Sequence, residues 1–386
     1  MPGFELIGKE EFEQVKEVFD KSGILFRHGF DKLRNGIYKV RDFEKAFASY
    51  MGQEDALAVT SGTAALKVIL EGFGIGKDDE VITQSFTFVA TVEGIIEVGA
   101  QPVIAEINDT LNMDPYDLEK KITEKTRAII VVHMLGVPCD MDQILSIAKK
   151  HHLIVIEDTA WGCGGSLNGK KLGTLGDGST FSFDFAKTMT TGEGGMVIIK
   201  DHEALERAKA YHDHGHENNP SLPRWEDSRS GSGFNYRMME LQGAVGLSQL
   251  KKLDFVIESQ RANKQKIKDK LKEIPGISFR RIPNTAFETA DALVFIVEDN
   301  AIARKCREAL LSVGLGTKIL PEAISWHFAG TWNHMPELTS KYGKDLDEVF
   351  RYSKNLLNRS VSLPIMVDMP DNIGKIIFDA LEPIFR

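Results

Sequence analysis

The chain has 386 residues, 42% of them hydrophobic and 27% charged, which is typical of a globular protein with two or three domains. Its formal net charge of −9 argues against broad nucleic-acid binding, so an anionic substrate would need a local basic pocket. The first residues do not resemble a signal peptide and no apolar run reaches membrane-spanning length. We therefore expect a cytoplasmic protein that binds neither nucleic acid nor membrane.

Strand-like and helix-like segments alternate through most of the chain. A helix is predicted at residues 9–20, followed by a polar, irregular stretch at 21–42. Strands are then predicted at 55–59, 80–83, 101–105, 126–132, 153–157, 179–183 and 195–199, and helices at 63–74, 89–98, 115–122, 141–151 and 202–212. Such alternation favours an α/β fold with a mostly parallel sheet covered on both faces. A long helix at about 238–273 would link this large domain, residues 1–250, to a smaller C-terminal α/β domain, residues 251–386.

The segment that begins at Thr60 has the features of a phosphate-binding helix start. Ser61 is a good N-cap residue, and apolar residues follow at helical spacing. The N–H groups of Gly62 and Thr63 would point outward at the positive end of the helix dipole, where an anion is favoured. A well-capped helix without a ligand is the alternative.

Two further segments place polar side chains at the ends of apolar elements. Asp158 closes an apolar run that reads as a buried parallel strand, and ligands of open α/β sheets lie at the carboxyl ends of strands. An acid there can pair with a protonated ring nitrogen, although Asp158 could instead cap the next helix. Asn235 and Arg237 stand in a turn before an apolar helix and could simply mark the start of that helix.

Lys187 lies between an apolar strand and a Gly-rich turn that opens another strand. A lysine held in this way can lose its proton and form a Schiff base with a carbonyl. A solvated lysine beside a glycine turn is the simpler alternative.

Taken together, the four segments resemble the DegT/DnrJ/EryC1/StrS family of sugar aminotransferases, which use pyridoxal 5'-phosphate (PLP). The resemblance includes the order of the segments along the chain. The resemblance implies a fold type I PLP-dependent transferase, with a mostly parallel seven-stranded sheet in the large domain. It implies that Lys187 holds PLP and moves a proton, and that Asp158 pairs with the pyridine nitrogen. Some dehydratases of the family have histidine in place of the lysine, so Lys187 favours amino transfer.

The same resemblance assigns further cofactor contacts. Gly62, Thr63 and Ser182 match the phosphate-binding positions, and Phe88 matches the aromatic residue that stacks on the cofactor ring. Phe86, two residues earlier, could stack instead, or both could belong to the core. Asn235 would reach the phosphate of a neighbouring subunit, which implies a homodimer with shared active sites. Trp161 departs from the family, which usually has glutamine there near the phenolate oxygen; the indole N–H could serve that oxygen or the ring could only pack.

The histidines leave alternatives open. His212, His214 and His216 alternate along the chain and could bind a metal from a strand, but His214 matches a turn of the family that lies near the sugar site. His133, at a strand end, could be structural or line the pocket. Three cysteines without a CxxC spacing suggest neither a zinc site nor a disulfide framework, and we expect no metal.

Three flanking segments, at residues 26–35, 213–217 and 325–334, are similar to the family branch that aminates the C8 aldehyde of oxidised 3-deoxy-manno-octulosonate (Kdo), giving the Kdo8N sugar of lipopolysaccharides. The resemblance implies glutamate and a small sugar acid as substrates. It makes candidate substrate-binding residues of Arg27, His28, His214 and His327. A free sugar acid needs cations for its carboxylate. Four basic residues lie close together in the sequence near the first of these segments: Arg27, Arg34, Lys39 and Arg41. The alternatives are a nucleotide-linked keto sugar as acceptor, a PLP sugar dehydratase, and a relative that binds PLP without catalysis.

Overall fold

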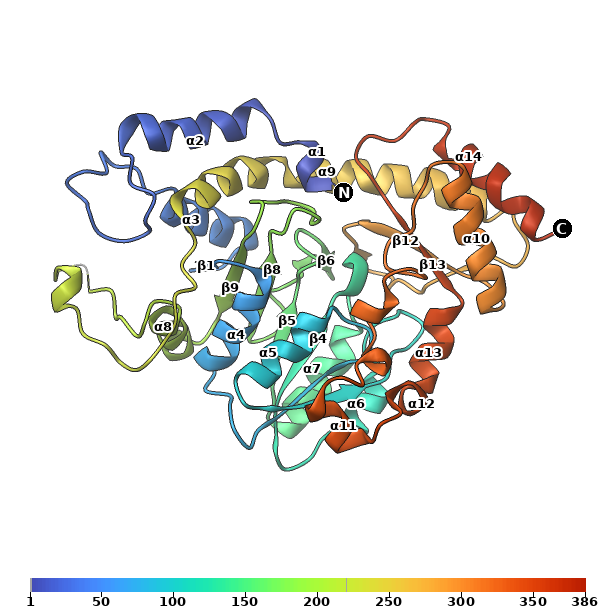
Figure 1. Ribbon diagram of the computed structural model, residues 1–386, viewed down its shortest axis with the longest axis horizontal. Coiled ribbons are helices and arrows are strands. Elements are labelled where there is room, and N and C mark those ends of the chain that lie inside the picture. Colours follow the sequence, from blue (N-terminus) through green and yellow to red (C-terminus); the bar gives the residue numbers. More distant parts are fainter. Residues whose placement is uncertain (1, 220) are drawn as a thin grey trace.

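A seven-stranded sheet forms the centre of the computed structural model, which describes residues 2–219 and 221–386 (Figure 1). The strand order is β1-β9-β8-β5-β4-β2-β3. The strands are β1 (Leu57–Val59), β2 (Glu80–Gln84), β3 (Gln101–Ala105), β4 (Thr126–Val132), β5 (Ile154–Asp158), β8 (Gly178–Ser182) and β9 (Gly195–Ile199). Strand β9 runs antiparallel to β1 and β8, and the other four pairings are parallel. The predicted sheet is confirmed, with strand ends shifted by one or two residues.

Helices cover both faces of this sheet because its strands are apolar on both sides. In β4, Ile130 packs in one hydrophobic cluster and its neighbour Ile129 in another on the opposite face. The first face is covered by α4 (Gly62–Gly72), α5 (Val89–Glu97) and α8 (His202–Tyr211). The second is covered by α6 (Pro115–Lys121) and α7 (Met141–His151), and nearer β1 by α3 (Lys39–Met51).

Helix α3 has no counterpart among the predicted elements and begins inside the stretch predicted to be irregular. Its apolar residues Val40, Phe43, Phe47 and Met51 recur at helical spacing and are buried. Tyr38, at the N-cap, makes no side-chain capping bond, so the usual start signal is missing. The helix ends at Gly52, which takes a left-handed conformation with a φ of 66°.

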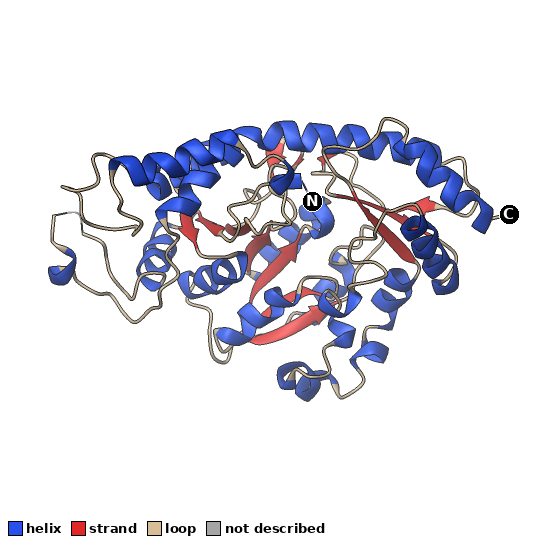
Figure 2. Cartoon of the chain, turned by 45° about the horizontal axis from the view of Figure 1, so that its top comes forward, coloured by secondary structure: helices blue, strands red, loops and turns tan. Residues whose placement is uncertain are grey.

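The long helix α9 (Glu240–Leu271) confirms the helix predicted at about 238–273. Figure 2 shows it running along both groups of strands. Helix α2 (Lys9–Lys21) packs on it, and α1 (Pro2–Glu5) lies beside its middle (Figure 1). Among the described residues, no helix is both long and apolar enough to cross a bilayer.

The C-terminal part builds a second, antiparallel sheet. It contains β10 (Ser278–Phe279), β12 (Ala292–Ile296) and β13 (Ser360–Pro364), covered by α10 (Asn300–Ser312) and α14 (Ile373–Leu381). A small third sheet joins β6 (Ser166–Leu167), β7 (Lys170–Lys171) and β11 (Ala286–Phe287). The remaining helices are α11 (Pro336–Tyr342), α12 (Leu346–Val349) and α13 (Arg351–Asn358).

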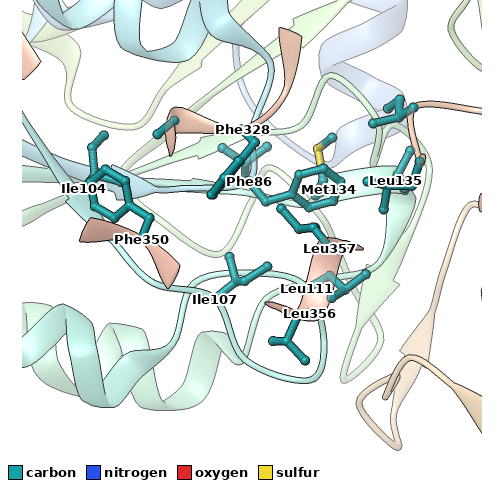
Figure 3. Close-up of a cluster of buried hydrophobic side chains, with 14 of the residues drawn as sticks. Phe86, Ile104, Ile107, Leu111, Met134, Leu135, Phe328, Phe350, Leu356 and Leu357 are labelled. Atoms are coloured by element: carbon teal, nitrogen blue, oxygen red, sulfur yellow. The ribbon is translucent and has the colours of Figure 1, made fainter. Parts of the chain in front are cut away.

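The largest apolar cluster joins the C-terminal third of the chain to the edge of the large sheet (Figure 3). Phe328, Phe350 and Leu357 pack there with Phe86 and Ile104. Phe86 and Phe328 also form an isolated antiparallel bridge. A division of the chain at residue 250 stays a prediction, but the packing ties the segment around Phe328 to the large half. This places the preceding turn, at residues 324–327, beside the carboxyl ends of the parallel strands.

Candidate active site

A cavity of about 320 Å³ lies where the parallel strands end and where α4 and α5 begin. This is the expected place for a ligand in an open α/β sheet. Eight of the predicted site residues line the cavity: Gly62, Thr63, Phe88, Asp158, Trp161, Ser182, Lys187 and His327. These residues lie up to 265 positions apart in the sequence, and the fold places them around one cavity.

The start of α4 forms one wall of the cavity. The Ser61 hydroxyl accepts a hydrogen bond from the Ala64 N–H at 3.0 Å, which confirms the predicted N-cap. The first N–H groups of a helix have no partner within it, and Gly62 and Thr63 present theirs at this wall. A Cβ on Gly62 would lie 2.8 Å from the Ser182 Cβ, so only glycine lets the helix start approach β8 this closely. The result is a narrow cradle suited to an anion.

Asp158, at the end of β5, is the buried acid of the cavity. The Thr91 hydroxyl donates to one carboxylate oxygen at 2.9 Å and the Ala160 N–H donates to the other at 3.2 Å. Burial raises the pKa of Asp158, and the hydrogen bond from Thr91 opposes that change. Thr180 lies on the same wall, and its buried hydroxyl has no hydrogen-bond partner among the described residues. A cationic ring atom and a hydrogen-bonding group of a ligand would satisfy these two side chains.

Lys187 projects into the cavity from the turn after β8. Its Nζ atom lies 3.3 Å from the centroid of the Trp161 ring. Burial, and after it the charge of Lys318, lower the pKa of Lys187 to about 8. Lys318 Nζ lies 4.6 Å from the same Trp161 ring and is ion-paired with Asp291. The indole that replaces the family's glutamine therefore packs against two amines by cation–π contact.

The aromatic wall settles one alternative. Phe88 lines the cavity and lies 5.4 Å from His327, measured between ring centroids. Phe86 is fully buried in the large apolar cluster and does not line the cavity, so it is a core residue. Burial lowers the pKa of His327 to about 4, so the ring is neutral at neutral pH, and its Nδ1 lies 2.8 Å from the Ala323 carbonyl oxygen.

Arg27, His28, His214 and Asn235 do not line the cavity of their own chain. Arg27 pairs with Glu44 at 2.6 Å, and His28 Nε2 lies 3.2 Å from Asp213. His214 and Asn235 are exposed. The cavity of the single chain therefore does not include these four predicted contacts.

The predicted cation cluster for a sugar carboxylate does not form. Arg34 is fully buried and donates to Glu240 at 2.9 Å, and Lys39 pairs with Glu17. Arg41 stacks over the Tyr38 ring at 4.2 Å. Arg34 and Lys39 are thus held by carboxylates far away in the sequence, a pairing that charge spacing alone does not reveal.

The histidines separate into individual structural roles. His133 is fully buried, with Nε2 2.9 Å from Glu157, so its structural alternative holds. The alternating histidines do not lie on a strand: His212 caps α8, His214 has a φ of 56°, and His216 lies 3.0 Å from Asp227. His212 and His216 therefore have separate surroundings, and His214 is exposed.

Several cavity residues are absent from the sequence-based set: Thr91, Thr180, Glu193 and Trp326, together with the neighbouring Lys318 and Asp291. Thr91 and Thr180 lie within three residues of predicted positions and could have been found by extending those segments along the strand and helix. Lys318 and Asp291 carry no local motif. They reach the site through β12 and β13, since the Lys318 N–H donates to the Ser362 carbonyl oxygen at 2.7 Å.

This set of groups fits PLP, a phosphorylated aromatic aldehyde with a basic ring nitrogen. The lysine can hold the aldehyde carbon, the start of α4 the phosphate, Asp158 the protonated nitrogen and Phe88 a face of the ring. The orphaned Thr180 hydroxyl and the close approach at Gly62 both indicate a built ligand site.

Comparison with known proteins agrees with this geometry. The model of the DegT/DnrJ/EryC1/StrS aminotransferase family matches residues 7–382. The spore coat polysaccharide biosynthesis protein SpsC of Bacillus subtilis is 33% identical over 396 residues, covering 99% of this chain and 96% of that protein. GDP-perosamine synthase of Vibrio cholerae is 37% identical over 347 residues, covering 89% of this chain and 90% of that protein.

A solved structure confirms the predicted fold type I architecture. The X-ray structure of the aminotransferase from Psychrobacter cryohalolentis matches with a TM-score of 0.86 and 27% identity, over 98% of this chain and 97% of that chain. The chain therefore belongs to the DegT/DnrJ/EryC1/StrS aminotransferase family and is a PLP-dependent sugar aminotransferase.

Proposed function

We propose that Lys187 and Asp158 are the catalytic residues, acting on PLP whose phosphate lies at Gly62, Thr63 and Ser182. When bound, PLP supplies an electron-accepting ring and a carbonyl carbon that carries the amino group. The observation that supports these roles is that a lysine, a buried carboxylate and a helix start line one cavity. Phe88 would pack on the ring, and Trp161 would hold the Lys187 amine.

Lys187 is suited to moving a proton between the donor Cα and the cofactor. An amine with a pKa of about 8 is partly neutral at neutral pH, and a base works best when its pKa is near the working pH. Asp158 would keep the ring nitrogen protonated, because a buried carboxylate is stabilised by a cation beside it.

The acceptor that we propose is the C8 aldehyde of oxidised Kdo, with glutamate as donor. Two of the three flanking segments that resemble this branch meet in the structure, since His28 contacts Asp213. Around them lie three arginines and two carboxylates: Arg27, Arg224, Arg237, Asp213 and Glu44. The excess of cations suits a sugar carboxylate. Because this cluster does not line its own cavity, the proposal requires that it face the cavity of a partner subunit.

The third flanking segment supports the same acceptor from within the chain. Trp326 and His327 line the cavity. The neutral ring of His327 donates from Nδ1 to the Ala323 carbonyl oxygen, so its Nε2 can accept a hydrogen bond from a sugar hydroxyl. His214 is the remaining candidate contact, and it is exposed on the segment that carries Asp213.

A nucleotide-linked keto sugar is the second candidate acceptor. The observation that favours it is the similarity to relatives named GDP-perosamine synthase, one of which is 37% identical over 89% of this chain. Arginines would also attract a diphosphate, so the charge of the cluster does not separate the two acceptors.

Absorbance spectroscopy tests the reaction and the donor together. Glutamate should convert the visible band of the lysine-bound cofactor into a near-ultraviolet band, and Lys187→Ala should have neither the visible band nor turnover. Retained turnover in Lys187→Ala would refute the central assignment. No spectral change in the native protein with glutamate would mean that another donor is used.

The acceptor is tested by adding it to the glutamate-treated enzyme. Oxidised Kdo aldehyde should restore the visible band, whereas GDP- or UDP-linked 4-keto sugars should not. Arg27→Ala should raise the KM for the Kdo aldehyde and leave the glutamate half-reaction unchanged. Restoration by a nucleotide sugar alone would establish the second candidate.

A further inference from the structure

The N-terminal segment contacts the main chain of the turn that carries Lys187. The Gly3 N–H donates to the Lys187 carbonyl oxygen at 3.0 Å. A Cβ on Gly3 would lie 2.7 Å from that oxygen, and 3.0 Å from backbone atoms of Met189 and Thr190. Because backbone atoms cannot turn aside as a flexible side chain does, this approach is open to glycine alone.

An aromatic pair extends this contact. Phe4 packs against Phe185 with ring centroids 6.4 Å apart. Both rings are about half exposed, at 45% and 52%. Phe185 lies two residues before Lys187, so this pair joins the N-terminal segment to the turn at residues 184–191.

A hydrogen-bond relay reaches the other end of the same turn. The Thr190 N–H donates to Gln249 Oε1 at 3.3 Å, and Gln249 Nε2 donates to Glu11 Oε1 at 3.0 Å. Lys252 then donates to Glu11 at 2.8 Å and to the Leu6 carbonyl oxygen at 2.7 Å. Residues 3–11 therefore hold the Lys187 turn at two points, one direct and one through α9.

The segment is itself held by the C-terminal part. The Glu5 carboxylate accepts hydrogen bonds from the Asp368 N–H at 3.1 Å and the Val367 N–H at 3.4 Å, in the loop after β13. Figure 1 shows α1 beside the middle of α9, between the large sheet and the C-terminal elements. A segment tied at both ends can transmit the position of the C-terminal part to the Lys187 turn.

We propose that residues 3–11 form a positioning strap for Lys187, with Gly3 as its positioning residue. This inference rests on the proposed role of Lys187. The strap fixes the main chain at Lys187 so that the long side chain delivers its amine to one place. A displacement of about 1 Å in a reacting group can lower a rate on the order of a hundredfold, so a hydrogen bond outside the cavity can matter to catalysis.

Gly3→Ala tests the strap, with Gly231→Ala as control. An added Cβ at Gly231 would meet nothing within 4 Å, and this residue lies outside the strap. In the cofactor-free protein, Gly3→Ala should raise hydrogen exchange of the amides at residues 184–191 by about tenfold or more, without changing the core strands. With PLP bound, the rate of the glutamate half-reaction should fall about tenfold at unchanged glutamate affinity.

The outcomes separate this inference from the proposed function. If Lys187→Ala is inactive but Gly3→Ala matches Gly231→Ala in both exchange and rate, the strap is refuted and the role of Lys187 stands. If Lys187→Ala keeps its activity, the proposed function fails first. A loss in Gly3→Ala that spreads to exchange across the whole core would show a general loss of stability and would also overturn the strap.

Discussion

At the scale of single residues, the neighbours of a charged group decide what it can do. Lys187 and Lys318 face the same indole, but Lys318 is ion-paired with Asp291, whereas Lys187 has its pKa lowered to about 8. Burial and the charge of Lys318 both disfavour the protonated Lys187. The surroundings of Lys187 therefore suit it to act as a base.

We predict that Lys318→Met raises the pKa of Lys187. The nearby positive charge disappears, and the unpaired Asp291 carboxylate then favours the protonated amine, so both effects act in the same direction. In the cofactor-free protein, the reactivity of Lys187 toward an amine reagent should rise through a midpoint near pH 8, because the neutral amine reacts. That midpoint should move to higher pH in Lys318→Met. It should stay in place in Lys305→Met, a substitution on the exposed side of α10.

Asp158→Asn should keep the cofactor site but remove most of the rate. The amide oxygen can still accept from the Ala160 N–H, and the amide NH2 can donate to the Thr91 hydroxyl oxygen, so the strand end is preserved. The neutral amide cannot stabilise a protonated ring nitrogen. We expect the glutamate half-reaction to slow about a hundredfold or more, measured by stopped-flow absorbance. Thr91→Val, which removes one hydrogen bond and keeps the carboxylate, should cost about tenfold or less. Near-normal rates in Asp158→Asn would mean that the ring nitrogen has another partner.

The sequence predicts the role of a side chain that stands in a recognisable local pattern. It does not predict the role of a side chain that depends on a partner far away in the sequence. Lys187, Asp158 and Gly62 stand in strand ends and turns whose patterns predict a site. Lys318 and Arg34 stand in no such pattern. Each is placed by an ion pair with a distant residue, Lys318 with Asp291 and Arg34 with Glu240. A sequence shows that an arginine is present, but its partner depends on which elements meet.

At the scale of elements, the contact between α4 and β8 creates the anion cradle. We predict that Gly62→Ala lowers the affinity for PLP about tenfold or more, because its Cβ would push the helix start away from Ser182. Equilibrium titration by cofactor absorbance measures the loss. The affinity for pyridoxal, which has no phosphate, should fall much less, and Gly231→Ala, where a Cβ meets open space, should change neither. Equal losses for the two ligands would show that the cradle does not hold the phosphate.

The elements that could be predicted are those with a strong, uniform pattern. The buried strand β4 is a continuous apolar run, and α7 is strongly amphipathic. Helix α3 has the right spacing of apolar residues but an uncapped start, and two-residue strands such as β10 have no pattern at all. Their structure is decided by the α9 and β12 surfaces on which they pack.

At the scale of the whole molecule, some of the residues proposed to contact the cofactor or substrate do not line the cavity of their own chain. Asn235 is exposed and does not line its own cavity, yet its segment is fixed on the sheet edge, where Thr60 N–H donates to the Tyr236 carbonyl oxygen at 3.0 Å. Exposed aromatic side chains gather on the same and neighbouring segments, among them Phe30, Trp225 and Phe234. Large apolar side chains that are exposed on neighbouring segments are a feature of interfaces. A symmetric dimer would carry Asn235 of each subunit to the cavity of the other.

We predict that two inactive variants, Lys187→Ala and Asn235→Ala, restore activity when their subunits are mixed. In a mixed dimer, the Lys187→Ala subunit would contribute Asn235 to the cavity that still has Lys187, so one complete site forms. Random exchange makes half of the dimers mixed with one of two sites complete, so activity should approach about one quarter of the native value. Subunits that exchange, as shown by native mass spectrometry, without restoring activity would mean that each cavity uses its own chain's Asn235 or none. As control, two differently tagged Lys187→Ala chains should exchange equally well and stay inactive, because no mixture of them supplies the missing amine.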